Sequence, residues 1–218
     1  MDRVRRWLPV AMLLVAAVGC ATVPERAYYP NPADPETRTV AEALWRAAKA
    51  SSEDPAHYSF ALIRSSDVSA YTIDDATFYF TQGLARQPAR VVDALVAHEV
   101  AHELLGHVGQ RRALALSLGA GFTVLGFAVP GAGLIDFVAN PLLVRAFTRE
   151  QEIAADTRAV EILRDMGHET PRRSMVEALR AAAKVNGTPR GGWLSVEPAL
   201  KDRLKALEPV ETETRAAK

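Results

Sequence analysis

The chain has 218 residues, of which 49% are hydrophobic and 24% are charged, a balance typical of a one-domain globular protein and not of a disordered chain. Lys and Arg total 26, as do Asp and Glu, so no basic excess is present to neutralise a phosphate backbone and no nucleic-acid partner is expected. The single Cys cannot form a disulfide within the chain.

The N-terminal residues have the pattern of a bacterial secretory signal. Arginines precede an apolar run over residues 8–18, which is shorter than the about 20 residues that a membrane-spanning helix needs. The run ends in Ala-Val-Gly-Cys, which resembles a lipoprotein cleavage box with Cys20 as the lipidated first residue; the alternative is an ordinary signal with an incidental Cys. Because Ala21 follows, where an Asp would resemble the inner-membrane retention signal, we expect a lipid anchor in the outer membrane of a bacterial cell envelope, on the periplasmic face.

These features divide the chain into four expected parts. They are a signal peptide over residues 1–19, a lipidated Cys and Pro-rich tether over 20–36, one domain over 37–210 and a polar tail over 211–218. Neither the composition nor the motifs indicate an oligomeric state.

The first half of the domain is expected to combine helices with short strands. Apolar residues recur at helical spacing over residues 37–51, and the stretches 58–63 and 77–80 have the composition of strands. Pro88 is placed to begin a helix whose apolar stripe ends near Gly106.

A long apolar stretch follows this helix. Residues 113–129 carry no charge and are close in number to the lower limit for a bilayer span, and a second apolar run up to residue 144 contains Asp136. One interpretation is a hairpin that dips into the membrane or covers the functional site. The other, which we favour because Asp136 would be costly in lipid, is a hairpin buried against the neighbouring helices.

The last part of the domain is predicted to be helical. Thr148 with Gln151 has the spacing of a capping box, Gly167 suits the end of that helix, and further helices are expected over residues 171–185 and 198–207. The expected fold class is therefore α+β, mostly helical, with a small β-sheet packed against the helix that Pro88 begins.

The strongest motif is His-Glu-Val-Ala-His at residues 98–102. Residues four apart on a helix point in similar directions, so His98 and His102 face one point, which suits one tetrahedral Zn²⁺ ion per chain. Glu99 is placed to take a proton from a zinc-bound water and to pass it to the leaving amine. The alternative is two buried histidines that meet this spacing by accident, and a third ligand elsewhere in the chain would decide between them.

Glu152 is the candidate for the third ligand. It opens the stretch Glu-Ile-Ala-Ala-Asp on a second helix, where Asp156 can accept a hydrogen bond from the outer nitrogen of a ligating His. The alternative is an ordinary solvated helix face. A site with a third His is excluded, because Leu105 and Val108 stand where that pattern needs Gly and His. His107 misses the spacing by one residue and is expected to end the helix or to support a ligand.

Together these motifs resemble the HtpX and CAAX-prenyl-protease group of zinc metallopeptidases, and more specifically its single-domain periplasmic lipoprotein members. The likeness runs from about residue 69 to residue 203 and includes the zinc helix and the second motif at residues 149–156. It implies a zincin-like domain that cleaves peptide bonds in unfolded or misassembled envelope proteins. It also implies that the strand near residues 77–81 is the sheet edge that lines the active-site cleft and pairs with an extended polypeptide substrate.

Two positions depart from the pattern of this group. Ser69 stands where an Asn is usual, and Glu197 where a His is usual, and both family residues lie near the substrate. Tyr71 and His168 are candidates to replace them in stabilising the transition state, and Arg203 is a further candidate because it matches the Arg of the C-terminal family motif.

Two other functions remain open on this evidence. One is a zinc-binding lipoprotein with a chaperone or scaffold role and weak proteolysis, and the other is hydrolysis of a cell-wall amide. The intact Glu99 favours an enzyme over a scaffold, and an edge strand favours a peptide over a glycan.

Overall fold

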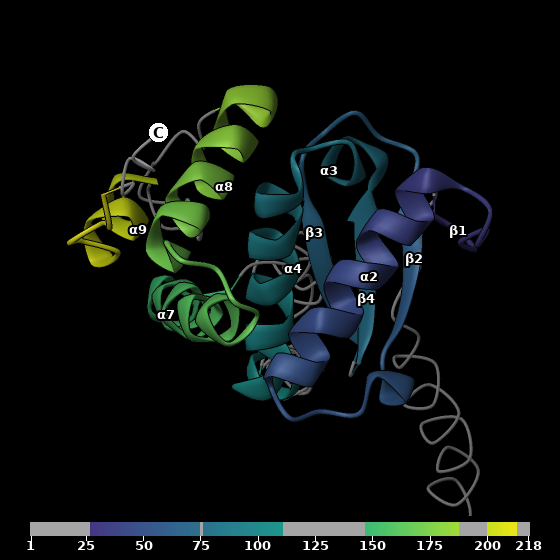
Figure 1. Cartoon of the computed structure of the whole chain (residues 1–218), viewed down its shortest axis with the longest axis horizontal. Coiled ribbons are helices and arrows are strands. Elements are labelled where there is room, and N and C mark those ends of the chain that lie inside the picture. Colours follow the sequence, from purple (N-terminus) through teal and green to yellow (C-terminus); the bar gives the residue numbers. More distant parts are fainter. Residues whose placement is uncertain (1–26, 75, 111–146, 188–199, 213–218) are drawn as a thin grey trace, which may run out of the picture.

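The computed structural model describes residues 27–74, 76–110, 147–187 and 200–212. Figure 1 shows a small β-sheet with helices against one face and a second group of helices beyond the central one. The expectations for the signal peptide, for Cys20, for the apolar stretch 113–144 and for Glu197 lie outside the described residues. The elements in chain order are β1 (Ala27–Tyr28), α2 (Pro35–Ala50), η1 (Pro55–His57), β2 (Ser59–Ile63), β3 (Ala70–Asp74), β4 (Thr77–Thr81), α3 (Gln82–Ala85), α4 (Ala89–Leu104), α7 (Arg149–Asp165), α8 (Pro171–Asn186) and α9 (Leu200–Ala206). The expected mostly helical α+β fold is confirmed.

Among the described residues, the sheet has four strands in the order β1-β2-β4-β3, with β1 and β3 at its edges. β2 and β4 run parallel, and β3 runs antiparallel to β4. The expectation that residues 77–81 form the sheet edge is wrong, because β4 lies between two partners and β3 is the edge on that side. Phe78 and Phe80 are fully buried and Tyr79 is 5% exposed, so β4 is covered on both faces, as an interior strand must be.

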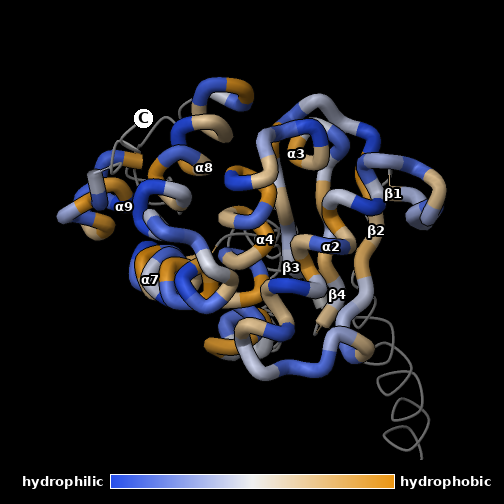
Figure 2. The backbone as a smooth tube through the Cα atoms, in the orientation of Figure 1, coloured by the Kyte–Doolittle hydropathy of each residue, from blue (hydrophilic) through white to orange (hydrophobic). Residues whose placement is uncertain are grey.

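Helix α4 is the centre of the domain. It packs against α2, α7, α8 and β3, and every residue from Val91 to His102 is buried. A helix surrounded in this way has no solvated face, so its buried residues extend beyond the one apolar stripe that the sequence predicted. Figure 2 shows orange apolar segments on the strands and inner helices, and blue on the connection from α2 to β2.

The helix ends follow the local signals of the sequence. Thr148 and Gln151 form a reciprocal capping box at the start of α7, as predicted. Gly106 and Gly167 have φ of 65° and 91° just past the ends of α4 and α7, a left-handed conformation that glycine adopts without steric cost. Within the described residues, no helix combines the length and the apolar character that a bilayer crossing requires.

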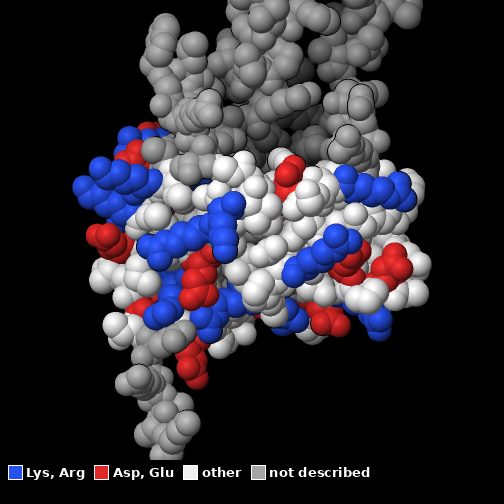
Figure 3. All heavy atoms as spheres, turned by 90° about the horizontal axis from the view of Figure 1, so that it is seen from above, with Lys and Arg blue, Asp and Glu red and all other residues white. Residues whose placement is uncertain are grey.

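Basic and acidic side chains lie close together on one face of the domain, which Figure 3 shows from above. Arg86 pairs with Glu36 at 2.7 Å, and Arg90 with Glu177 at 3.2 Å. Because these pairs are exposed, each contributes at most about 1 kcal/mol to stability, and the fold depends on the core instead.

Candidate metal centre

Four nitrogen and oxygen atoms of three side chains on α4 and α7 lie close together, so that two imidazoles and one carboxylate form a small triangle of donor groups. His98 Nε2 and His102 Nε2 lie 3.1 Å apart, and Glu152 places its Oε2 3.4 Å from the first and its Oε1 3.6 Å from the second. Ligand atoms at about 2.0–2.1 Å from a tetrahedral Zn²⁺ are about 3.3 Å from one another. The donor set and the size of this triangle therefore fit a zinc ion, and within the described residues it is the one group of metal-binding character.

Two further residues contact the ligands on the side that faces away from the triangle. Asp156 Oδ1 lies 2.9 Å from His98 Nδ1, the nitrogen that points away from the triangle. Arg203 of α9 donates to both oxygens of Asp156, at 2.7 and 2.6 Å, and its third nitrogen lies 2.9 Å from Glu152 Oε2. The guanidinium thus joins the two carboxylates, so Arg203 contacts Glu152 of the ligand set directly.

The electrostatics of the triangle leave Glu152 and His102 ready to bind a metal, whereas His98 holds a proton. Burial alone would raise the pKa of Glu152, but the hydrogen bond and charge of His98 and the charge of Arg203 lower it to about 2, so this carboxylate is ionised. Burial and the neighbouring charge of His98 lower the pKa of His102 to about 2, so its imidazole is neutral. Burial would lower the pKa of His98, but Asp156 and Glu152 raise it to about 9. A metal that binds both imidazoles must displace the proton held on His98.

Glu99 lies next to this triangle and is held by the edge strand. Its side chain is buried, and Thr72 Oγ1 of β3 donates a hydrogen bond to its Oε2 at 2.6 Å. The motif alone did not indicate Thr72, because a single Thr in a strand carries no distinctive spacing. Pairing of Thr72 with Phe78 in the register places it on the sheet face that α4 covers, which is why it meets Glu99.

The structure does not bring Tyr71 and His168 to this cluster. Tyr71 is 45% exposed and neighbours Thr72 along β3, so its side chain points to the opposite face of the sheet from Glu99. His168 lies between Asp93 and Ser174, with 3.1 Å to each, and is part of a separate polar cluster. Their assignment as transition-state candidates rested on residue type alone and stays a prediction. Ser69 accepts a hydrogen bond from Asn186 Nδ2 at 3.1 Å.

Asp93 anchors this second cluster and supplies a test of stability. Arg46 Nη2 lies 2.6 Å from its Oδ1, and His168 Nε2 lies 3.1 Å from its Oδ2. Although burial raises the pKa of Asp93, the hydrogen bonds from His168 and Arg46 lower it below its usual value. A carboxyl with a lowered folded-state pKa stabilises the fold above its unfolded pKa of about 3.9 and loses this contribution as the pH falls further.

We therefore expect Asp93→Asn to lower the free energy of unfolding by about 1.5–3 kcal/mol at pH 7, toward the lower value because Arg46 is partly solvated. The part of this difference that comes from the lowered pKa of Asp93 should be present above about pH 4 and be lost below it. Urea unfolding at pH 7 and pH 3.5 measures both. Asp165→Asn, at an exposed position of α7, is the matched control and should change stability by less than about 0.5 kcal/mol. A difference that stays undiminished well below about pH 4 would contradict the assignment.

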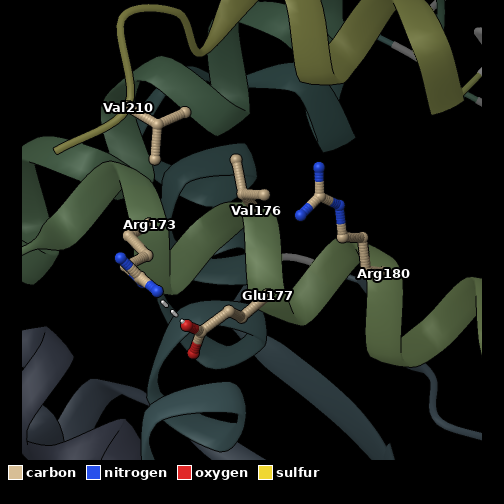
Figure 4. Close-up of a pocket in the computed structure, with 5 residues that line it drawn as sticks. All are labelled: Arg173, Val176, Glu177, Arg180 and Val210. Carbon is tan, nitrogen blue, oxygen red and sulfur yellow. Dashed lines mark hydrogen bonds and ion pairs between the residues drawn. The ribbon is translucent and has the colours of Figure 1, made fainter. Parts of the chain in front are cut away.

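A separate hollow of about 290 Å³ lies between α8 and the C-terminal segment. Figure 4 shows the five side chains that line it, with Arg173 and Glu177 joined by an ion pair of 3.2 Å. None of the three candidate metal ligands contributes to its walls. This hollow is therefore distinct from the metal centre.

Two imidazoles one helical turn apart, a Glu on a second helix and a Glu beside the first imidazole define a site of the metallopeptidase class. The family model of peptidase family M48 matches residues 33–211, and the chain belongs to this family. The resemblance to the HtpX group is thereby confirmed, and with it a metallopeptidase function. Comparison with curated proteins gives no match.

Proposed function

We propose that this protein is a zinc-dependent metalloendopeptidase in which His98, His102 and Glu152 hold the ion. The observation that carries the proposal is the triangle of their donor groups, in which the two imidazole Nε2 atoms lie 3.1 Å apart and the two oxygens of Glu152 lie 3.4 and 3.6 Å from them. Two imidazoles and one carboxylate are the ligand set of open, catalytic zinc sites. When bound, zinc supplies Lewis acidity and lowers the pKa of a water molecule toward neutrality.

Glu99 is the proposed general base. Its carboxylate takes a proton from the attacking water and then delivers that proton to the leaving amine, so one group serves both halves of the reaction. The hydrogen bond of 2.6 Å from Thr72 restrains Oε2 and so fixes the orientation of the carboxylate. Asp156 accepts from His98 Nδ1 and thereby keeps the Nε2 lone pair directed into the triangle.

The proposed substrate is an extended polypeptide that pairs with the outer edge of β3. β3 is a sheet edge in the described part of the chain, and Thr72 places this strand in contact with the proposed base. Binding by strand addition depends on hydrogen bonds to the substrate backbone more than on its side chains, so it suits unfolded or misassembled proteins of varied sequence. The edge strand also favours peptide bonds over the amides of the cell wall.

The proposed location is the periplasmic face of the outer membrane, through a lipid on Cys20. This proposal rests on the apolar run and the Ala-Val-Gly-Cys box that end at this residue. Cys20→Ser should move the protein from the membrane fraction to the soluble periplasmic fraction. Unchanged membrane association of this variant would contradict the lipid anchor.

The metal and the activity can be tested together with a matched pair of variants. Wild type is expected to contain about one zinc per chain and to cleave unfolded casein. Glu152→Gln removes the charged ligand and should weaken zinc binding by more than about 100-fold, because loss of a mere supporting hydrogen bond already costs up to about 100-fold. We expect this variant to lose cleavage as well. Glu150→Gln, at an exposed position in the same helical turn, should retain both.

Three results would count against parts of this proposal. A folded wild type that binds no zinc would contradict the metal site itself. Zinc binding without cleavage of any unfolded protein would favour the scaffold alternative. Equal zinc affinity of Glu152→Gln and wild type would remove Glu152 from the ligand set.

A further inference from the structure

The two proposed ligand imidazoles differ in what holds their outer nitrogens. His98 Nδ1 lies 2.9 Å from a carboxylate oxygen of Asp156. His102 Nδ1 instead lies 3.0 Å from Nδ1 of His107, a second imidazole. His107 is therefore in direct contact with the ligand set, although its spacing in the sequence excludes it from the ligand pattern.

A count of protons determines which of the two rings, His102 or His107, donates the hydrogen bond between them. A neutral imidazole has one N–H donor and one lone pair. His102 presents Nε2 to the ligand triangle, so when this lone pair binds a metal the proton must lie on Nδ1. That N–H then donates to the lone pair on His107 Nδ1, and His107 carries its own proton on Nε2.

The surroundings of this contact hold both rings in place. His102 is 1% exposed and His107 is 6% exposed. Phe147 stacks on the His102 ring with 3.8 Å between centroids and an interplanar angle of 20°, and it also borders His107 at 6.1 Å. The left-handed turn at Gly106, with φ of 65°, ends α4 and precedes His107 directly.

We propose that His107 is a positioning residue for the metal ligand His102. As a neutral acceptor it fixes the tautomer and ring orientation of His102 with Nε2 toward the metal, the role that Asp156 has for His98. It does so without adding charge to a site that already holds Glu99, Glu152 and Asp156 against Arg203. This proposal rests on the proposed zinc site and concerns metal affinity as well as catalysis.

The test compares two substitutions at this position in the full chain. Asn can place its Oδ1 near the position of His Nδ1 and still accept the hydrogen bond, whereas Leu keeps the bulk and cannot accept. We expect His107→Leu to weaken zinc binding about 10–100-fold, measured by competition with a chromophoric chelator, and His107→Asn to remain within about 3-fold of wild type. The visible spectrum of bound Co²⁺ should change for His107→Leu and be preserved for His107→Asn.

Controls separate this proposal from a loss of folding and from failure of the zinc site. His57→Leu, at an exposed position of η1, should leave zinc affinity unchanged. Circular dichroism and thermal unfolding in the presence of chelator check that each variant is folded. Wild-type affinity in a folded His107→Leu overturns the proposal, as does His107→Asn as weak as His107→Leu, because the position would then act through packing. A wild type without zinc affinity would overturn the proposed function instead.

Discussion

Glu99→Gln is expected to bind zinc with the affinity of wild type and to cleave unfolded casein about 10²–10⁴-fold more slowly. Gln has the size of Glu, and its carbonyl oxygen can still accept the hydrogen bond that Thr72 now donates at 2.6 Å. The amide cannot take a proton from the attacking water, so the step that needs a base is lost while the fold and the ligand triangle are kept. Zinc content and initial cleavage rates, measured on the same preparations, separate the two properties.

The control for this result is a variant at the same position that carries its carboxylate on a shorter side chain. Glu99→Asp keeps the base but withdraws it by one methylene, and we expect an activity between those of Glu99→Gln and wild type. Cleavage by Glu99→Gln within about 10-fold of wild type would contradict the role of Glu99, since removal of a general base costs more than this. Loss of zinc from Glu99→Gln would point instead to a structural role.

Arg203→Met is expected to lower the free energy of unfolding by about 3–5 kcal/mol in the presence of a chelator. The guanidinium reaches Asp156 at 2.6 and 2.7 Å and Glu152 at 2.9 Å, and its side chain is only 17% exposed. Met fills similar space without charge, so two buried carboxylates lose their main cation. Zinc supplies positive charge to the same group, and saturation with zinc should therefore recover part of the loss. Urea unfolding with and without zinc measures both values.

Two substitutions on the same helix control for charge and for α9 itself. Arg203→Lys keeps a positive charge, but one ammonium group cannot span both carboxylates as the planar fork does, so an intermediate loss is expected. Lys201→Met removes an exposed charge from α9 and should change stability by less than about 0.5 kcal/mol. If Arg203→Met unfolds with wild-type stability in chelator, the guanidinium is not the main counter-charge of Glu152 and Asp156.

Much of the fold followed from local signals that are readable in the sequence. The capping box at Thr148, Pro171 at the start of α8, and the glycines after α4 and α7 each act on the adjacent backbone, and these helix ends lie where the residues predict. The start of α2 is predicted less well, because the sequence assigns Pro35 to the tether and Pro35 instead begins the helix. The ligand spacing is equally local, because residues four apart on any helix share a face. His98 and His102 therefore meet at 3.1 Å for a reason that the motif itself contains.

The strand pairing could not be read in the same way. The composition of residues 77–81 predicts a strand, but not which strands flank it. β4 is an interior strand because β2 pairs with it in parallel on one side, and β3, which lies between β2 and β4 in the sequence, pairs with it on the other side. The edge that faces the proposed base is therefore β3, and Tyr71 points away from the base because side chains alternate between the two faces of a strand.

The sequence by itself thus determined the helices, the paired imidazoles and the presence of a second acidic motif, because all of these depend on neighbours within one or two turns. Only the tertiary structure decided what surrounds them. The contacts of Thr72 with Glu99, Arg203 with Glu152 and His168 with Asp93 join residues that are 27, 51 and 75 positions apart. Even His107, five positions from His102, reaches that ligand through a left-handed turn at Gly106 and a ring from Phe147. Such contacts depend on how whole elements pack, and no periodicity along the chain encodes that packing.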